Sequence, residues 1–228
     1  MQTMKKTLYS FSMVLIMVFT ILFSVFTVVN TNSFYSQQYR AINADEATGV
    51  SLDNLDEITT MLLDYLNDRR DNLDMQVEKW GVMKQVFDER ETSHMVDVKN
   101  LYSFFAKVMY ATFTAAAIIM IYLFRKDGKA QFFAMAVKGY KSALIIAVIL
   151  CVIFATAFTV GFNSFWTLFH EVMFTNDLWL LDPRISTMIN MYPLPFWLAM
   201  CTAILQRFAI IFICIYPVLN TMKKHYNR

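Results

Sequence analysis

Four long apolar blocks divide this 228-residue chain and constrain its fold more than any other feature. Each block is close to the ~20 residues that a helix needs to cross a bilayer. Hydrophobic residues make up 57% of the chain and charged residues 17%, whereas a soluble domain carries about a quarter charged residues. Because a helix satisfies its own backbone polar groups inside lipid, we predict an all-α membrane protein with four transmembrane helices.

Basic residues lie at the amino terminus, in one short central loop and in the carboxy-terminal tail. A four-span topology puts these three segments on one side, which the positive-inside rule makes cytoplasmic. The chain is thus predicted to be a multi-pass protein with both termini cytoplasmic. The predicted segments are transmembrane helix 1 at 1–30, an extracellular cap at 31–100, transmembrane helix 2 at 101–124, a basic cytoplasmic loop at 125–141, transmembrane helix 3 at 142–161, a second extracellular cap segment at 162–195, transmembrane helix 4 at 196–219 and a cytoplasmic tail at 220–228.

The first cap segment is acidic, with fourteen Asp or Glu against seven Lys or Arg in residues 31–100. Apolar residues recur at helical spacing over 52–66, and Ser51 can cap that helix. A second helix is predicted over 86–99, leading into transmembrane helix 2. A third, short helix is predicted over 183–191, with Asp182 as its N-cap and a proline at its first position. The cap is therefore predicted to be mainly helical.

Common catalytic and cofactor signatures are missing. The five glycines lie too far apart for a dinucleotide loop, a phosphate loop or a nucleophile elbow. His170 and Glu171 begin a zinc-protease pattern, but Phe174 stands where its second histidine belongs. The three cysteines have no CxxC spacing. We therefore predict no metal and no cofactor, and the sequence gives no support for a nucleotide or nucleic-acid partner.

Two histidines far apart in sequence are expected at the same membrane depth. His94 directly precedes the second span and His170 directly follows the third, so both lie at the outer boundary. On a helix, Glu91, His94 and Asp97 share one face, and an acid beside a histidine can orient the ring. From spacing alone, a solvated charged face explains the first motif and an interfacial aromatic anchor explains the second.

Arg207 is the one arginine near the middle of a predicted span. A charge at that depth is costly and usually faces the protein interior or a wet cavity. An interhelical hydrogen-bond partner and a substrate-facing role both remain open for this side chain.

Three motifs together resemble the lipoprotein intramolecular transacylases, a family of bacterial four-span membrane enzymes. The resemblance extends over nearly the whole chain and implies a protein of the bacterial cell membrane. The motifs are Glu91-x-x-His94-Met95-x-Asp97-Val98-Lys99, then Phe169-His170-x-x-x-Phe174-x-Asn176-Asp177-x-Trp179-x-Leu181-Asp182-Pro183, and Met191-x-Pro193. The family often carries acids in the short helix and after Pro193, where this chain has Ser186 and Leu194, so those acids are not expected to be essential.

The resemblance implies transfer of the sn-2 acyl chain of a lipoprotein's diacylglyceryl group to the α-amino group of its own N-terminal cysteine. The product is a lyso-form lipoprotein, and the substrate partner is a diacylated lipoprotein in the bilayer. The resemblance assigns catalysis to His94 and His170. We favour His170 for proton transfer with the amine and His94, oriented by Asp97, for polarising the carbonyl; which of the two is the base stays open.

Further side chains complete the predicted site. The supporting or orienting residues are Glu91, Asp97, Lys99, Asn176, Asp177 and Arg207. The predicted walls of a substrate chamber are Phe104, Phe105, Phe165, Trp166, Phe169, Trp179 and Trp197. The alternative is a non-enzymatic membrane assembly or lipid-binding accessory protein whose acidic extracellular cap is a docking surface. A separation of more than ~10 Å between the two histidines would argue against joint catalysis, because a catalytic group must reach its proton directly or through one water.

Overall fold

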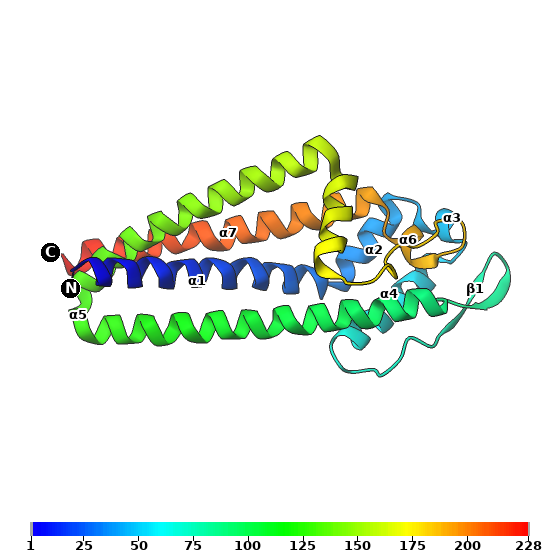
Figure 1. The fold of residues 1–228 in the computed structure, drawn as a ribbon, viewed down its shortest axis with the longest axis horizontal. Helices are drawn as coiled ribbons and strands as arrows, with labels where there is room; N and C mark the ends of the chain where they lie inside the picture. Colours follow the sequence, from blue (N-terminus) through cyan, green and yellow to red (C-terminus); the bar gives the residue numbers. More distant parts are fainter. Residues whose placement is uncertain (1, 228) are drawn as a thin grey trace. The chain divides into compact units, whose positions relative to one another are not determined.

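The structure, a computed structural model, describes residues 2–227. Met1, the first residue of the predicted segment 1–30, and Arg228, the last residue of 220–228, lie outside the described residues. The side chains of Gln2 and of residues 158–160 are also outside the description. The elements are α1 (Gln2–Val29), α2 (Asn32–Ala41), α3 (Ala44–Thr48), α4 (Leu52–Leu66), β1 (Gln76–Lys79), β2 (Val82–Gln85), α5 (Glu89–Met173), α6 (Thr187–Met191) and α7 (Leu194–Tyr226) (Figure 1).

The chain forms two compact units. The first, here called the helix unit, comprises Met1–Val25, Ala106–Trp166 and Ile204–Arg228. The second, the cap unit, comprises Phe26–Phe105 and Thr167–Ala203. Helices α1, α5 and α7 each contribute residues to both units.

Within the described residues, three helical segments are long and apolar enough to cross a membrane: Thr3–Val29, Glu89–Ala157 and Leu194–Tyr226. The second has 69 residues, more than three times the ~20 that one crossing needs. The predicted second and third spans both fall on α5. The prediction of a mainly helical chain with membrane-length apolar helices is therefore confirmed.

Helix α5 is interrupted where its backbone leaves the helical conformation at two glycines. Gly128 has φ 71° and ψ 166°, a combination that essentially only glycine adopts without strain. At Gly161 the backbone is extended, with φ 174°. Figure 1 shows α5 reversing its direction between two long legs. Gly128 therefore divides α5 into two apolar legs within the helix unit.

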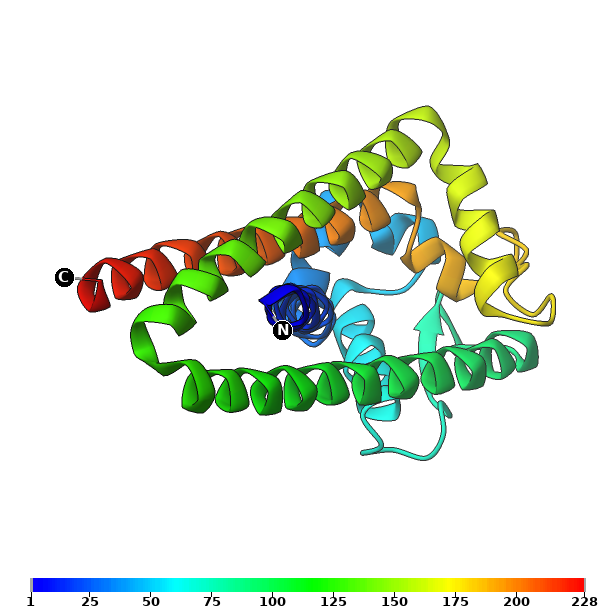
Figure 2. The same ribbon diagram turned by 60° about the vertical axis from the view of Figure 1, so that its left-hand side comes forward.

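The core of the helix unit is formed by α1 against both legs of α5 and against α7, and Figure 2 shows α1 almost end-on with these helices around it. A methyl group added to Gly139 would come within 2.7 Å of the Tyr9 carbonyl oxygen, so the two backbones are in close contact. Tyr140 donates a hydrogen bond to the Phe212 carbonyl (3.0 Å). Asp127, beside the Gly128 break, pairs with Lys5. The Gly139 and Tyr140 contacts hold the second leg against α1 and α7, and the Asp127 pair ties the break to α1.

An aromatic cluster forms the core of the cap unit. Tyr35, Tyr39, Tyr192 and Phe196 are in mutual ring contact, with centroids 4.8–6.4 Å apart. The Tyr39 hydroxyl shares a hydrogen bond with Thr59 (2.7 Å) and donates one to Tyr192 (3.3 Å). Burial raises the pKa of the Tyr39 phenol. This cluster ties α2 and α4 to the end of α6 and the start of α7.

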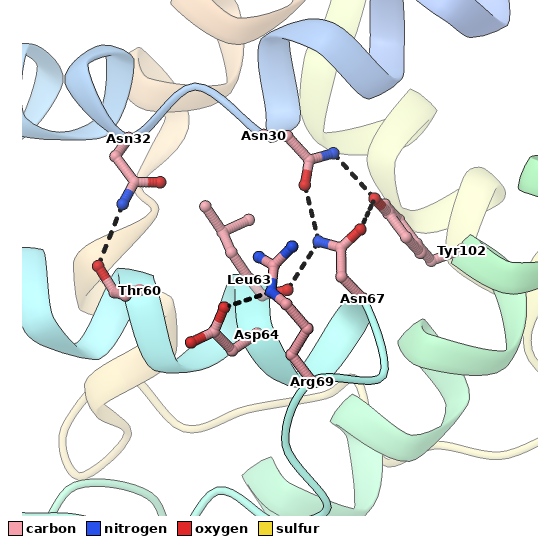
Figure 3. A network of polar contacts seen from close by, with 8 residues as sticks. All are labelled: Asn30, Asn32, Thr60, Leu63, Asp64, Asn67, Arg69 and Tyr102. Carbon is pink, nitrogen blue, oxygen red and sulfur yellow. Dashed lines mark hydrogen bonds and ion pairs between the residues drawn. The ribbon is translucent and has the colours of Figure 1, made fainter.

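A ring of amide and hydroxyl groups fixes the start of the apolar part of α5 (Figure 3). Asn67, at the end of α4, donates to Asn30 (2.7 Å) and accepts from Tyr102 (3.0 Å). Asn30 in turn donates to the Tyr102 hydroxyl (2.8 Å). Three elements distant in the sequence therefore meet in the cap unit close to the helical segment that carries His94.

A hairpin within residues 76–85 was not foreseen from the sequence. Strands β1 and β2 pair antiparallel around Trp80 and Gly81, both of which have positive φ, as a two-residue type I′ turn requires. Trp80 donates its backbone N–H to Gly49 (2.9 Å), and a methyl group on Gly49 would meet the Trp80 ring at 2.3 Å. Lys79 donates to Thr187 (2.9 Å). The hairpin is thus attached to both α3 and α6.

Two predicted helix boundaries in the cap are wrong. Helix α5 begins at Glu89 rather than at residue 86, because Asp88 and Glu91 form a capping box. Helix α6 begins at Thr187 rather than at Pro183, because Ser186 is its N-cap and accepts from Ile189. Asp182 instead forms a turn in which its carboxylate accepts from the Arg184 backbone (3.0 Å). The predicted Ser51 cap of α4 is confirmed, since its hydroxyl accepts from Asn54.

Candidate functional site

The two histidines lie at opposite ends of α5 and meet inside the cap unit. His94 is on the second turn of the helix, directly after the capping box, and His170 is on its last turn. Their ring centroids are 6.1 Å apart. Both side chains are buried, with 7% and 6% exposure. The pair satisfies the distance condition for acting on one bound molecule.

Aromatic rings surround the histidine pair. Phe174 contacts both imidazoles, with its centroid 5.3 Å from His94 and 5.6 Å from His170. Trp179 lies over the His170 ring at 4.9 Å, and Phe169 contacts it edge-on at 5.3 Å. These rings keep bulk water away from the imidazole faces.

The surroundings of His94 keep its imidazole neutral. Burial, and then the nearby His170, lower the His94 pKa from 6.5 to about 4, against an opposing effect of the Asp97 carboxylate. Its buried Nδ1 atom has no hydrogen-bond partner among the residues that the structure describes. An unpaired buried polar atom is costly, and a catalytic role is one of the reasons for which a protein keeps one. His94 thus offers a neutral ring with one nitrogen available to a substrate.

The pH dependence of the free energy of unfolding should reflect the burial of the His94 imidazole. Between about pH 6.5 and pH 4 the unfolded chain binds a proton at His94 that the folded chain does not, so stability is complete above this window and falls as the pH drops through it. The titratable neighbours are His170 and Asp97. We expect the unfolding temperature of the wild type to drop more between pH 7 and pH 5 than that of His94→Asn. An identical drop in both proteins would contradict the assignment.

A network of loop hydrogen bonds links Asp97 to Trp179. The Asn176 side chain donates to Asp97 (2.8 Å) and accepts from the Leu178 backbone (3.1 Å). The Trp179 indole donates to the Asn176 carbonyl (3.0 Å). Asn176 therefore connects the ring over His170 to the carboxylate one helical turn beyond His94.

Glu91 does not orient His94 as the spacing suggested. Its carboxylate is 1% exposed and accepts from the Ser186 hydroxyl (2.6 Å), the Met188 backbone (2.8 Å) and the Asp88 backbone (2.8 Å). One donor is the N-cap of α5, and the other two come from the N-cap and first turn of α6. Glu91 therefore anchors α6 to the helix that carries His94.

The other predicted supporting residues lie apart from the imidazole pair. Lys99 pairs with Asp68 (2.7 Å) and lies over the Tyr65 ring (4.3 Å). Asp177, 76% exposed, pairs with Arg90 (3.4 Å). Arg207 is half-buried on the part of α7 that belongs to the helix unit.

The predicted chamber residues are brought together only in part. Phe169 and Trp179 contact His170. Phe104, 58% exposed, packs on Phe105 at 5.4 Å, and Trp197 packs on the aromatic cluster of the cap through Tyr192 and Phe196. Phe165 and Trp166 belong to the helix unit. The structure adds Phe174, Asn100 and Ser186, which were not assigned roles; Phe174 was signalled by its place in the histidine motif.

A small pocket of about 180 Å³ lies in the cap unit beside Phe174. Its lining combines a carboxylate, two carboxamides and apolar side chains. The lining residues are Asp97, Asn100, Leu101, Met173, Phe174, Thr175 and Asn176. Among the described residues, no group of three or more His, Cys, Asp or Glu side chains is arranged to hold a metal ion.

Comparisons with known proteins identify relatives of the chain. The model of the family "Lipoprotein intramolecular transacylase Lit" matches residues 10–197. A solved structure of the membrane-integral lipoprotein intramolecular transacylase Lit from Bacillus cereus has a TM-score of 0.76 and 23% identity, covering 98% of this chain and 99% of that chain. Two structures of the same enzyme with one histidine replaced, by alanine or arginine, share 24% identity, with TM-scores of 0.76 and 0.74. The alanine variant covers 99% of this chain and 97% of that one, and the arginine variant 100% and 96%.

The structural likeness shows a shared fold of integral membrane type. No match was found among curated protein sequences. The family match over residues 10–197 is therefore stronger evidence for the activity of the chain than the structural likeness is.

Proposed function

This chain belongs to the lipoprotein intramolecular transacylase family, and from that premise we propose that it moves the sn-2 acyl chain of a lipoprotein's diacylglyceryl group to the α-amino group of its own N-terminal cysteine. The product is a lyso-form lipoprotein. The observation that carries the proposal is the buried pair of imidazoles, His94 and His170, with centroids 6.1 Å apart. No redox step or nucleotide is required, because an ester is exchanged for a more stable amide.

The proposed topology has four crossings, with α1 and α7 each contributing one and α5 two. The break at Gly128 supports two crossings by α5, since an apolar leg lies on each side of it. Both termini and the basic segment 125–141 are proposed to be cytoplasmic, following the positive-inside rule. The cap unit, with His94 and His170, then lies on the extracellular side of the bacterial cell membrane.

The proposed reaction begins at the amine. The α-amino group has a reference pKa of about 7.7–8, so a fraction of it is neutral near neutral pH. This neutral nitrogen attacks the ester carbonyl, and His170 accepts a proton from the nitrogen as the C–N bond forms. His94, neutral because of its burial, donates its N–H to the oxyanion. The C–O bond to the glyceryl group then breaks, and the proton held by His170 passes to the departing oxygen.

In this proposal, most of the catalytic effect comes from holding the amine and the ester in the reactive orientation. Amine and ester belong to one molecule, so catalysis needs their orientation, which can be worth about 7–11 kcal/mol in favourable intramolecular cases. The rings of Phe174, Trp179 and Phe169 support a dry setting around the imidazoles. Excluding water protects the ester from hydrolysis.

Co-expression with a diacylated lipoprotein tests the proposal. A transfer within one molecule leaves the total mass unchanged, so the readout is fragmentation mass spectrometry of the N-terminal lipopeptide. We expect fragments of N-acyl cysteine joined to a monoacylglyceryl group. A lipoprotein that keeps a diacylglyceryl group and a free α-amine, in the presence of folded protein, would overturn the proposal.

A further inference from the structure

The pocket of about 180 Å³ in the cap unit adjoins the histidine pair through one shared wall. Phe174 lines this pocket and also contacts both imidazoles, at 5.3 and 5.6 Å. Asp97, another lining residue, is close enough to raise the pKa of His94. The pocket is thus adjacent to the proposed reacting centre without containing either histidine.

The lining of the pocket favours a small cationic or amine-bearing group. Asp97 is its one charged side chain, and Asn100 and Asn176 add amide donors and acceptors. The hydrogen bond from Asn176 (2.8 Å) fixes the Asp97 carboxylate, and the bond from the Leu178 backbone fixes Asn176. The carboxylate is therefore held in place, and its remaining lone pairs are available to a donor.

We propose that this pocket receives the α-amino group of the lipoprotein's N-terminal cysteine and its first peptide bond, with Asp97 accepting a hydrogen bond from the amine and Asn100 contacting the peptide amide. This inference rests on the proposed function. In this proposal Asp97 binds the substrate, whereas the sequence predicted that it orients His94.

The size of the pocket fits this ligand better than the acyl chains. Sites for drug-sized molecules are usually about 300–1,000 Å³, and this pocket is about 180 Å³. It has room for one amino acid residue and not for two long hydrocarbon chains. Leu101, Met173 and Phe174 form its apolar side, which can contact the cysteine side chain.

A carboxylate at this position also assists the chemistry. When the amine attacks the ester, the nitrogen gains positive charge before its proton leaves. Asp97 accepts from that N–H and stabilises the charge as it develops. The proton still goes to a histidine and from there to the glyceryl oxygen, so Asp97 neither gains nor loses a proton over the cycle.

The experiment measures binding with an unreactive probe. A lipopeptide with two ether-linked alkyl chains on its glyceryl group cannot transfer an acyl chain, and it is prepared with a free or an acetylated α-amine. At pH 6.5 we expect wild-type protein in detergent to bind the free-amine form about fivefold more tightly, the size of a partly exposed ion pair. Asp97→Asn should lose this preference, although its side-chain oxygen can still accept from Asn176.

Glu171→Gln is the matched control, since Glu171 is an exposed acid beside His170 that does not line the pocket. It should keep the preference for the free amine. An Asp97→Asn protein with the wild-type preference, or a wild type that binds both probes equally, would overturn the inference. The proposed function is tested separately, by the activity of the wild type on the diacyl ester. If the wild type is active but shows no preference for the free amine, only this inference is overturned.

Discussion

His94→Asn and His170→Asn are each expected to lower the rate of acyl transfer by about 10²–10⁴-fold, the usual contribution of a positioned acid or base. Asparagine keeps a polar side chain of similar reach but has no group that exchanges a proton near neutral pH. The rate is measured as N-acyl lyso-lipopeptide formed from a synthetic diacyl lipopeptide. Because both imidazoles serve one step, the double variant should be little slower than the slower single variant.

The third histidine of the chain supplies the matched control. His225 is exposed near the end of α7, and His225→Asn should transfer acyl chains at the wild-type rate. Unfolding temperatures in detergent show whether each variant is folded. A folded His94→Asn or His170→Asn protein with full activity would remove the two-histidine assignment, while leaving family membership untouched.

The apolar helices were predictable because their signal is local. Each block of about 20 apolar residues is recognisable without knowing what it packs against. The same holds for Ser51, where a hydroxyl residue directly precedes a periodic helix and does cap it. The expectation that His94 and His170 would meet needed only the order of spans and loops, and their 6.1 Å separation agrees with it.

The partners of individual side chains were not predictable in this way. Spacing put Glu91 and His94 on one helix face, but the Glu91 carboxylate is bound by Ser186 and Met188, which come from a segment nearly a hundred residues later. Helical periodicity says which residues share a face and nothing about which donors arrive there. The hairpin was missed for a related reason: Trp80-Gly81 is a weak turn signal, and the packing of Trp80 on Gly49 stabilises it from outside the segment.

Glu91→Ala is expected to lower the free energy of unfolding of the protein by about 1–3 kcal/mol, because it leaves the buried backbone N–H group of Met188 without an acceptor. The part-buried N–H of Asp88 also loses its acceptor, but it can bind water instead. The Ser186 hydroxyl also loses its acceptor, although it can rotate toward another. Thermal or denaturant unfolding in detergent, followed by tryptophan fluorescence, measures the change. Glu91→Gln keeps the shape and one acceptor oxygen, so its loss should be smaller.

Asp177→Ala is the control for removing an acid from the cap, since its exposed pair with Arg90 should contribute at most about 1 kcal/mol. A double-mutant cycle with Ser186→Ala separates the hydrogen bond from general damage, and groups in direct contact typically couple by about 0.5–3 kcal/mol. Loss of the α6 anchor should also admit water to His94 and move its pKa up from about 4 toward 6.5. If Glu91→Ala unfolds like the wild type, α6 is held by the aromatic cluster and the hairpin alone, and Glu91 has no positioning role at the site.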